Sequence, residues 1–522
     1  MGTPTMWRAA ALLAGAIALP HAAQPAAAVP ARRAAAQPAP QLPTAQRPRL
    51  IVLTDIGNEP DDQMSLVRLL LYANELDIEA IIAVTSTWQK DRVSPEIARG
   101  VITSYGAVRP NLLLHADGWP TAQTLLARLS TGIPAYGMAG MANAPLSDGA
   151  RAIINAADAD DERPVWIALW GGANTLAQAL AHVRATRSAP ATAAFIARLR
   201  VHAISDQDDA GPWIRREFPT LFVIGKPSAP DGAEYASATW TGISGDHFYR
   251  NGAGADFTTV SNEWLDVNIR RKGPMGAHYP RYMFIMEGDT PSFLGLIPNG
   301  LQTGEHPNWG GWGGRYLLRQ PYGEQRAIWT QGGDSFPRIT SADDVDGHVS
   351  DQATIWRWRP AFQNDFAARM DWTIQPFALA NHAPVLVVNG QGGTAPVRMD
   401  AVVGQPILLD GSASTDPDGN RLTWRWFQYR EAGFADNVTP APVAISRGNT
   451  ARATITATAT SQPFWLPWGD APATGTAHII LAATDNGRPA ITRYRRIILT
   501  VRPAATQPTT AQPAPSLPEH RP

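Results

Sequence analysis

Two periodicities follow one another along the chain. Up to residue 371, short apolar runs alternate with stretches whose apolar residues recur at helical spacing, as in residues 50–71 and 94–108. Strands and helices that alternate at these lengths predict βαβ units and an α/β fold, a mainly parallel sheet with helices on both faces. A long helix over residues 351–371, interrupted at Pro360, closes this part. The predicted strands are residues 50–53, 78–88, 112–115, 166–169, 200–205 and 220–225, and an apolar run from residue 283 that ends at Glu287.

From residue 381 the period changes to two. Turn-forming residues, such as the cluster at 416–420, separate short segments in which apolar and polar residues alternate. Several short strands of this kind predict an antiparallel immunoglobulin-like β-sandwich of about a hundred residues. The segments are residues 384–388, 406–410, 421–429, 451–458, 477–485 and 493–501.

The two ends of the chain have the composition of segments outside a fold. Residues 1–23 combine Arg8, an apolar run and a small-residue segment, which is the plan of a secretory signal peptide. Residues 24–47 and 503–522 are rich in Ala, Pro and Gln, which predicts a linker and a disordered tail. The predicted domains are therefore residues 48–380 and 381–502, in a secreted or periplasmic protein.

Composition removes several functional classes. A formal net charge of -1 over 522 residues gives no long-range field for nucleic acid or an anionic membrane, so neither is an expected partner. No apolar run reaches the length of a membrane span, which predicts no membrane insertion. The chain has no cysteine, so disulfides and thiol catalysis are excluded.

Four carboxylates lie within eight residues where the first predicted strand gives way to a helix. Asp55 ends the strand, and Glu59, Asp61 and Asp62 follow it. Loops at the carboxyl ends of parallel strands form a ligand crevice, so these side chains are expected to converge. Oxygen ligands without Cys or His favour a hard cation, Ca²⁺ before Mg²⁺. In the alternative, Asp61 and Asp62 only cap the helix that begins near Pro60, which does not require Asp55 or Glu59.

The same stretch carries a resemblance to a known family. Thr54-Asp55-x-Gly57 followed by Asp61-Asp62 resembles the amino-terminal fingerprint of nucleoside hydrolases, Asp-x-Gly-x-Asp-Asp, with extra residues in the turn. Residues 54–88 as a whole resemble a secreted bacterial branch of that family, the cellulose-binding, nucleoside-hydrolase-like proteins. The resemblance implies a nucleoside-hydrolase-like fold for the first domain and a bound Ca²⁺.

The resemblance also assigns roles to site residues. It implies that Asp289, far along the chain, is the last metal ligand and completes the shell with Asp55 and Asp62, while Asp61 holds sugar hydroxyls. Many nucleoside hydrolases place a His immediately before that last Asp to protonate the leaving base. This chain has Gly288 at that position, so its leaving-group chemistry differs or another residue supplies the proton.

A glycine turn, residues 171–174, follows a predicted strand, as it does in nucleoside hydrolases. There a backbone carbonyl at the strand end joins the calcium shell, and here Leu169 and Trp170 are both candidates. The alternative is a tight turn that simply begins a helix. We place Asn174, Glu287 and Trp88 at the rim of the predicted pocket.

Tryptophans suggest a carbohydrate surface. The segment at residues 306–316 sets Trp309 and Trp312 among four glycines, where indole faces are free to lie exposed and stack on sugars. The alternative is that each fills an irregular loop core. His247, His278 and His306 are possible proton donors, although a lone histidine is more often structural.

The second domain has a resemblance of its own. Residues 409–426 resemble the opening of immunoglobulin-like modules of the PKD and cadherin-like kind. Asp416 and Asp418 are possible Ca²⁺ ligands, but an Asp-Pro-Asp-Gly hairpin turn is the preferred interpretation. We expect the module to support or target the first domain.

These patterns lead to competing functions. In the first hypothesis the protein is a metal-dependent glycosyl hydrolase of an N-glycosyl or related bond, with Asp55 as the base that deprotonates water. In the second it is a carbohydrate-binding (cellulose-binding) protein that retains the hydrolase pocket without chemistry. The third, nucleoside hydrolysis, requires another leaving-group acid. The expected ligand is a carbohydrate or a nucleoside-like small molecule.

Overall fold

The computed structural model describes residues 47–229, 232, 234–245, 255–331, 341–432, 438–463 and 474–504. All of them belong to one compact unit, Gln37–Pro522. The expected signal peptide, the linker up to residue 46 and the tail from residue 505 lie outside these ranges, as does His247. None of the helices in the described ranges is long and apolar enough to cross a membrane.

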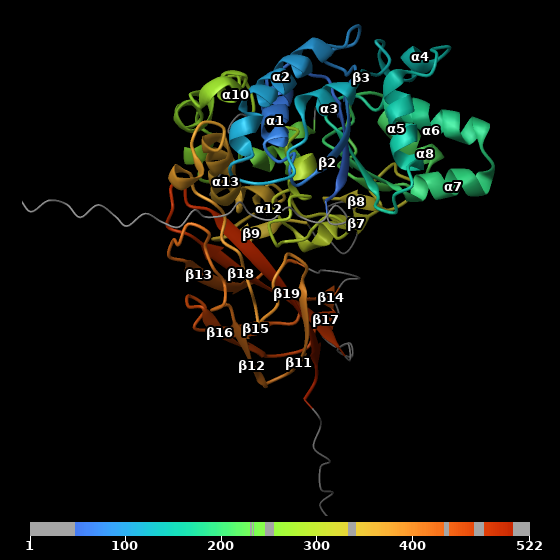
Figure 1. The fold of residues 1–522 in the computed structure, drawn as a ribbon. Helices are drawn as coiled ribbons and strands as arrows, with labels where there is room; N and C mark the ends of the chain where they lie inside the picture. The colour runs from blue at the N-terminus through green and yellow to red at the C-terminus, as the bar shows by residue number, and fades with distance from the viewer. Residues whose placement is uncertain are drawn as a thin grey trace, which may run out of the picture. The chain divides into compact units, whose positions relative to one another are not determined.

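Eight strands of the described residues form one large sheet, in the order β3-β2-β1-β4-β5-β6-β8-β7 (Figure 1). Neighbouring strands run parallel, except that β7 and β8 form an antiparallel edge. The predicted mainly parallel sheet is confirmed. The strands are β1 (Arg49–Thr54), β2 (Asp77–Ala83), β3 (Leu129–Thr131), β4 (Val165–Leu169), β5 (Leu199–Ala203), β6 (Phe222–Ile224), β7 (Leu317–Arg319) and β8 (Ile328–Thr330).

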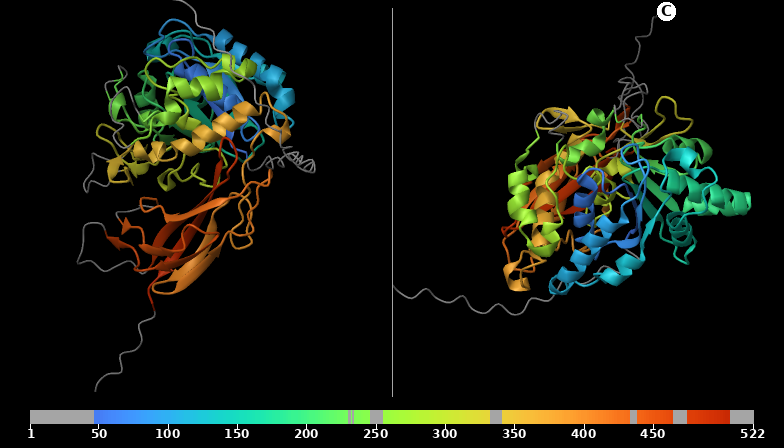
Figure 2. Two further views of the ribbon diagram at one scale, coloured as in Figure 1. Left: turned by 90° about the vertical axis from the view of Figure 1, so that its left-hand side faces the viewer. Right: turned by 90° about the horizontal axis from the view of Figure 1, so that it is seen from above.

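The sheet is buried on both faces. Along β1, Leu50 and Val52 enter one hydrophobic core, whereas Ile51 and Leu53 enter the other, because successive side chains of a strand point to opposite faces. Viewed from above (Figure 2), helices lie on both sides of the strands. The first core is closed by α1 (Asp61–Leu70), α2 (Pro95–Leu112), α3 (Ala122–Ala127), α9 (Asn262–Leu265), α10 (Gly273–Ala277), α11 (Pro291–Leu294), α12 (Ala353–Trp356) and α13 (Arg359–Asp371). The second is closed by α4 (Gly137–Met141), α5 (Asp148–Asp158), α6 (Asn174–Thr186), α7 (Ala189–Ala197) and α8 (Ala210–Glu217).

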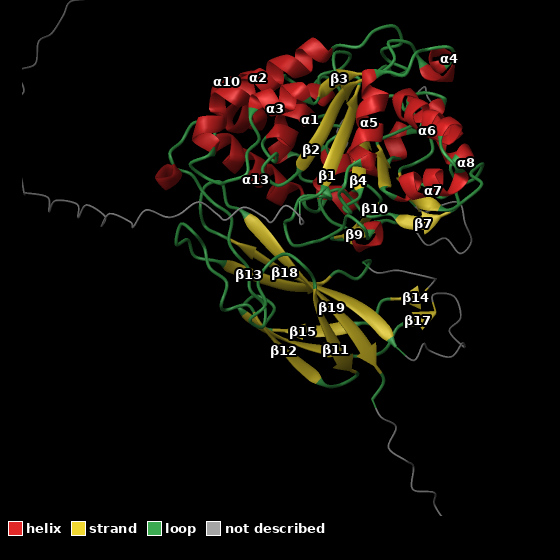
Figure 3. Cartoon of the chain, turned by 45° about the vertical axis from the view of Figure 1, so that its right-hand side comes forward, coloured by secondary structure: helices red, strands yellow, loops and turns green. Residues whose placement is uncertain are grey.

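The C-terminal strands form the expected sandwich (Figure 3), with two departures. The predicted strand over residues 384–388 is wrong, because that segment makes only isolated bridges at Val385 and Val388, and the edge strand is β11 (Val397–Val402), which was not predicted. A four-stranded sheet in the order β11-β19-β18-β13 and a three-stranded sheet in the order β12-β16-β15 enclose a separate core. Pairing is antiparallel except between β11 and β19, which are parallel. The strands, with the preceding hairpin, are β9 (Asp343–Val345), β10 (His348–Ser350), β11 (Val397–Val402), β12 (Pro406–Asp410), β13 (Thr423–Gln428), β14 (Val438–Thr439), β15 (Val443–Ser446), β16 (Arg452–Ala457), β17 (Gln462–Pro463), β18 (Gly475–Thr484) and β19 (Thr492–Arg502).

Two predicted strands of the first domain are wrong. Residues 112–115 continue the end of α2 as turns, and the third strand of the sheet is β3 instead. The run that begins at residue 283 is irregular up to Asp289. Short apolar runs carry too little periodicity to separate a strand from a buried loop or a helix end. The predicted interruption at Pro360 is confirmed, since α12 ends before it and Pro360 lies in the first turn of α13.

Candidate metal and ligand site

The site lies where the strand order reverses. The chain runs outward from β1 through β2 to β3 and then returns to β4 on the other side of β1, so β1 and β4 flank the topological switch point. Ligand crevices of open α/β sheets form at such points. Asp55 directly follows β1 there, and Gly171 follows β4. A Cβ on Gly171 would lie 2.9 Å from that of Asp55, so the turn after β4 must lack a side chain there.

A tight turn joins β1 to α1 and brings its acids to one place. Gly57 has a φ of +110°, and a Cβ there would approach Ser94 to 2.9 Å, so glycine is required for both conformation and space. The hydroxyl of Thr54 donates to Asp62 and accepts from the backbone N–H of Ile56 at 3.1 Å. These bonds fix the start of α1 against the end of β1.

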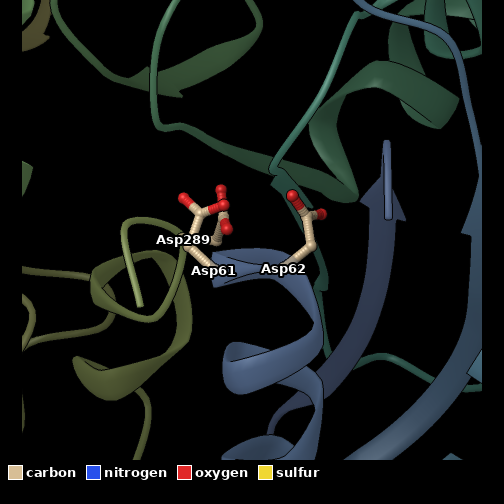
Figure 4. A group of neighbouring side chains, drawn as sticks. All are labelled: Asp61, Asp62 and Asp289. Atoms are coloured by element: carbon tan, nitrogen blue, oxygen red, sulfur yellow. The ribbon is translucent and has the colours of Figure 1, made fainter. Parts of the chain in front are cut away.

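Three aspartates form a close cluster (Figure 4). Asp61 and Asp62 occupy the first turn of α1, and Asp289 comes from the loop before α11. Each offers one carboxylate oxygen, and these oxygens all lie within 4.8 Å of one another. The Asp289 loop is held by the hydroxyl of Ser292, which donates to the Asp289 carbonyl at 2.6 Å and accepts from the indole N–H of Trp170 at 2.8 Å.

The cluster opens into a cavity of about 260 Å³. Five carboxyl side chains line it: Asp55, Glu59, Asp61, Asp62 and Asp289. None of the other described residues that line it is Lys, Arg or His, so no cationic side chain of the described chain faces the cluster there.

Burial and mutual repulsion make these carboxylates costly to ionise. Burial, followed by the charges of Glu59 and Asp55, raises the pKa of Asp61 to about 7. Burial is also the largest cause that raises the pKa of Asp55, Asp62 and Asp289, and neighbouring aspartates raise that of the last two further. Burying several carboxylates that repel one another costs folding free energy, and a bound cation that neutralises them would offset this cost.

The donor set fits a hard cation. Oδ2 of Asp289 is buried and has no hydrogen-bond partner among the described residues, which leaves an oxygen free to bind one. The structure also separates the two carbonyl candidates of the glycine turn. The Leu169 carbonyl accepts from the backbone of Ile204, whereas the Trp170 carbonyl accepts from the side chain of Gln207, in the lining of the cavity. Carboxylate and carbonyl oxygens are the ligands of Ca²⁺.

The geometry groups the aspartates differently from the sequence-based assignment. The predicted metal set was Asp55, Asp62 and Asp289, with Asp61 on the ligand. The close cluster instead contains Asp61, and Asp55 lies beside it, hydrogen-bonded to Asp62. All four side chains line the same cavity, as do the predicted Glu59 and Trp88.

Four further cavity residues were not found from the sequence. Oε1 of Gln207 and the indole N–H of Trp240 are buried without a partner among the described residues, and both line the cavity. Phe284 is 44% exposed in the lining, where Trp88 is 45% exposed, and Asn58 also lines it. Gln207 and Phe284 lie in irregular loops and Trp240 in a short 3₁₀-helix (Thr239–Ile243), where no motif or period marked them. Asn58 lies within the acidic turn, but an uncharged residue between Gly57 and Glu59 gave no signal of its own.

Two predicted rim residues are corrected by the structure. Asn174 is fully buried and is outside the cavity lining: its side-chain amide donates to the Ala135 carbonyl at 2.8 Å. Glu287 is also fully buried, in an ion pair with Arg68, and accepts a hydrogen bond from the Thr290 hydroxyl at 2.8 Å. The carboxylate of Glu287 therefore compensates a buried arginine and does not reach the cavity.

The predicted tryptophan platform is also corrected. Trp312 is 0% exposed, with its ring centroid 6.4 Å from that of Tyr494 in the C-terminal domain. Trp309 is 8% exposed and stacks on His306 at 3.9 Å. Trp309 lines a different cavity, of about 360 Å³, beside Pro48 and thus at the opposite end of the strands. The glycines let both indoles turn inward, where the second domain covers them.

A side chain at the position of the missing histidine would crowd the aspartate cluster. A Cβ on Gly288 would lie 2.8 Å from a carboxylate oxygen of Asp61 and 3.2 Å from the ring of Trp240. Trp240 thus stands close to the place where a side chain at position 288 would extend. His278 is half-buried and does not line the cavity.

The comparisons with known proteins agree with this architecture. The family described as cellulose-binding Sde182, nucleoside hydrolase-like domain, matches residues 49–316, and the family described as cellulose-binding protein Sde0182, C-terminal domain, matches residues 406–501. No curated protein matched the sequence.

A solved structure, a nucleoside hydrolase-related hypothetical protein from Saccharophagus degradans that is associated with carbohydrate metabolism, is 34% identical to this chain. The match covers 87% of this chain and 100% of that chain, with a TM-score of 0.71. A solved PKD domain from the KIAA 1837 protein is 16% identical over 22% of this chain and 86% of that chain, with a TM-score of 0.14 that supports no comparison. The first domain therefore has a nucleoside-hydrolase-like fold, and the chain belongs to the cellulose-binding Sde182 family.

Proposed function

We propose that this protein is a secreted, calcium-dependent glycosyl hydrolase that cleaves an N-glycosyl or related glycosidic bond of a saccharide. The observation that carries the proposal is the set of five carboxyl groups around one cavity of about 260 Å³. A protein that only binds sugar needs hydrogen-bond partners and aromatic faces, but it has no need for buried acids that repel one another.

Calcium would be held by Asp61, Asp62 and Asp289, with Asp55 and the Trp170 carbonyl beside them. The ion would neutralise the carboxylates and bind oxygen atoms of the sugar and of water. The free Oδ2 of Asp289 and the absence of Lys, Arg and His from the described lining support this assignment.

Asp55 is the residue to which we assign the base. It is buried at the end of β1, where the strand fixes its backbone and Ser86 bonds its side chain. Burial raises the pKa of Asp55, which makes its carboxylate a better proton acceptor than an exposed aspartate. Asp55 would take the proton of the water that attacks the anomeric carbon, and the neighbouring carboxylates would stabilise the oxocarbenium-like transition state. Glu59, the remaining acid of the lining, would face the leaving group.

A carbohydrate is the substrate class that the rest of the lining fits. Gln207 offers an acceptor and Trp240 a donor, both buried and without a partner among the described residues, which matches hydroxyl groups that donate and accept. Trp88 and Phe284 supply exposed aromatic faces in the same lining. The cellulose-binding description of the family, and the association of the solved relative with carbohydrate metabolism, support the same class and an extracellular location.

The second candidate is a carbohydrate-binding protein that retains the hydrolase cavity. Gly288 favours it, because glycine supplies no leaving-group acid and a side chain there would crowd Asp61. The two functions share the ligand class and differ in turnover.

A parallel screen separates these functions from nucleoside hydrolysis. The purified chain is incubated with β-glucan and other plant oligosaccharides and with nucleosides, each with calcium and with a chelator, and reducing ends and free base are measured. Calcium-dependent release of reducing ends from a saccharide supports the proposal. Release of base from nucleosides alone would assign the cavity to nucleosides instead.

A further inference from the structure

A buried carboxylate oxygen of the C-terminal domain lacks a partner. Asp485, in the turn after β18, is 3% exposed. Its Oδ1 accepts from the side-chain amide of Asn381 at 3.0 Å and from the backbone N–H groups of Gly487 at 2.8 Å and Ile491 at 3.1 Å. These three donors take one side of the carboxylate. Oδ2 is buried and has no hydrogen-bond partner among the described residues.

A second orphaned oxygen belongs to Asp416, in the turn between β12 and β13. Oδ1 of Asp416 accepts from the backbone N–H groups of Asp418 at 2.9 Å and Asn420 at 3.0 Å, while Oδ2 is buried without a partner in the described chain. One amide bridges the two turns: Asn381 donates to Asp485 and accepts from the side chain of Asn420 at 2.7 Å. The two free oxygens therefore belong to adjacent turns.

No described side chain forms an ion pair with Asp416 or Asp485. Asp418 is occupied by His382, whose backbone N–H and ring nitrogen bond its carboxylate at 2.7 and 3.0 Å. Arg493 acts on Asp485 only at a distance, because its guanidinium bonds to Asp365. Burial, together with the charge of Asp485, raises the pKa of Asp416, although no hydrogen bond joins their side chains.

We propose that Asp416 and Asp485 hold a second Ca²⁺, between the two turns of the C-terminal domain. Two buried carboxylate oxygens without donors, in turns that the Asn381 side chain joins, are the kind of oxygen ligand that Ca²⁺ takes. Backbone carbonyls of the turns and water complete its coordination. This assignment differs from the Asp416 and Asp418 pair considered from the sequence, because Asp418 is already engaged.

The ion ties the beginning of the domain to its sheet. Asn381 stands between the two acids, and its carbonyl accepts from the indole N–H of Trp372 at 2.8 Å, just after α13. Calcium at this point fixes the junction at which the chain leaves the first domain, independently of the cavity at β1.

The test counts calcium ions on the full-length chain. Protein freed of metal with a chelator is dialysed against calcium chloride, and bound calcium is measured by emission spectrometry. Asp62→Asn is introduced to disable the first site. This variant should retain one Ca²⁺ per chain, and its thermal unfolding midpoint should rise with calcium. Adding Asp485→Asn, or separately Asp416→Asn, should remove both effects.

Controls make each outcome decisive. Asparagine keeps Oδ1 and its donors, so the added variants should remain folded in chelator, with an unfolding midpoint no lower than that of Asp62→Asn. Asp400→Asn, an exposed acid of the same domain, should leave the calcium count unchanged. Calcium retained after both Asp416→Asn and Asp485→Asn would overturn the proposal, as would an Asp62→Asn protein that binds none. If the parent binds a single Ca²⁺ that Asp485→Asn removes and Asp62→Asn does not, the result supports the second site and refutes the first.

Discussion

Replacing Asp61 with asparagine should stabilise the protein when calcium is absent. In the metal-free chain, burial and the charges of Glu59 and Asp55 raise the pKa of Asp61 from its usual 3.8 to about 7. The folded state therefore holds this proton more tightly than the unfolded state. The stability that the proton gives is fully present below a pH of about 4 and is lost as the pH rises through about 7. Above that pH, the ionised carboxylate opposes folding.

The expected magnitude follows from that pKa. The rise from 3.8 to about 7 corresponds to about 4 kcal/mol at about 1.4 kcal/mol per pH unit. Partial exposure of Asp61 and protonation shared with its neighbours reduce the effect to about 2 kcal/mol. Asp61→Asn, which keeps the shape and removes the charge, should raise the free energy of unfolding by that amount at about pH 8 in chelator, and by much less near pH 5.

Urea unfolding followed by tryptophan fluorescence measures this, with and without calcium. Saturating calcium should stabilise the parent through the first site by about 2.7 kcal/mol at a hundred times the Kd of that site. Asp61→Asn should lack this contribution and keep only the stabilisation from the second site. Asp148→Asn is the matched control, because Asp148 also lies in the first helical turn, of α5, but is exposed. It should lower stability by about 0.5 kcal/mol through the helix dipole, with or without calcium. If Asp61→Asn destabilises the chelated protein as the control does, the electrostatic account of the cluster is wrong.

Three further variants test other parts of the site. In a calorimetric titration, Trp240→Phe should weaken saccharide binding by about fivefold, because one hydrogen bond is lost, and should leave calcium affinity unchanged. The control Trp119→Phe should change neither affinity, because Trp119 is another buried indole whose N–H has no partner among the described residues but lies outside the cavity. Glu287→Gln should lower the free energy of unfolding by about 3 kcal/mol, because it leaves Arg68 buried without its counter-charge, and equal calcium affinity would confirm that this acid is not a ligand. Gly288→Ala should reduce calcium affinity by about tenfold, because its Cβ would lie 2.8 Å from a carboxylate oxygen of Asp61. Unchanged affinity would show that the loop shifts to make room for the methyl group.

The acids of the first loop were predictable because they are local. Asp55, Glu59, Asp61 and Asp62 sit within one strand-turn-helix unit, and the periodicity on either side fixes where that unit ends in the sheet. Asp289 is far along the chain, and only the family resemblance pointed to it. Which acid joins the close cluster depends on side-chain directions in an irregular turn, which no spacing rule determines.

Residues of irregular loops were not predictable. Glu287 and Asp289 are two positions apart, yet one compensates Arg68 in the core and the other faces the cavity. Trp309 and Trp312 looked exposed among glycines, but a second domain packs over them, and that contact is not encoded in the local pattern.

The fold shows the same division. Long periodic segments such as α2 and α13 were recognised, as were β1, β2, β4, β5 and β6 of the sheet, whereas β3, β7 and β8 were not. The short apolar runs at residues 112–115 and from residue 283 were assigned to strands and are not, because a run of four apolar residues suits a helix end or a buried loop equally well. The parallel pairing of β11 with β19 is set by how the strands are arranged in the folded domain, and neither strand's own sequence indicates it.

The rate of glycosidic bond cleavage by the parent and by Asp55→Asn, on the oligosaccharide that the screen identifies, tests the central claim most directly. The account predicts that calcium restores the activity that a chelator abolishes. It also predicts that Asp55→Asn lowers kcat by about 10²- to 10⁴-fold, because the base is lost, while the Kd for the oligosaccharide changes far less. A parent that binds calcium and saccharide but releases no reducing ends, or an Asp55→Asn protein that turns over at the parental rate, would contradict it.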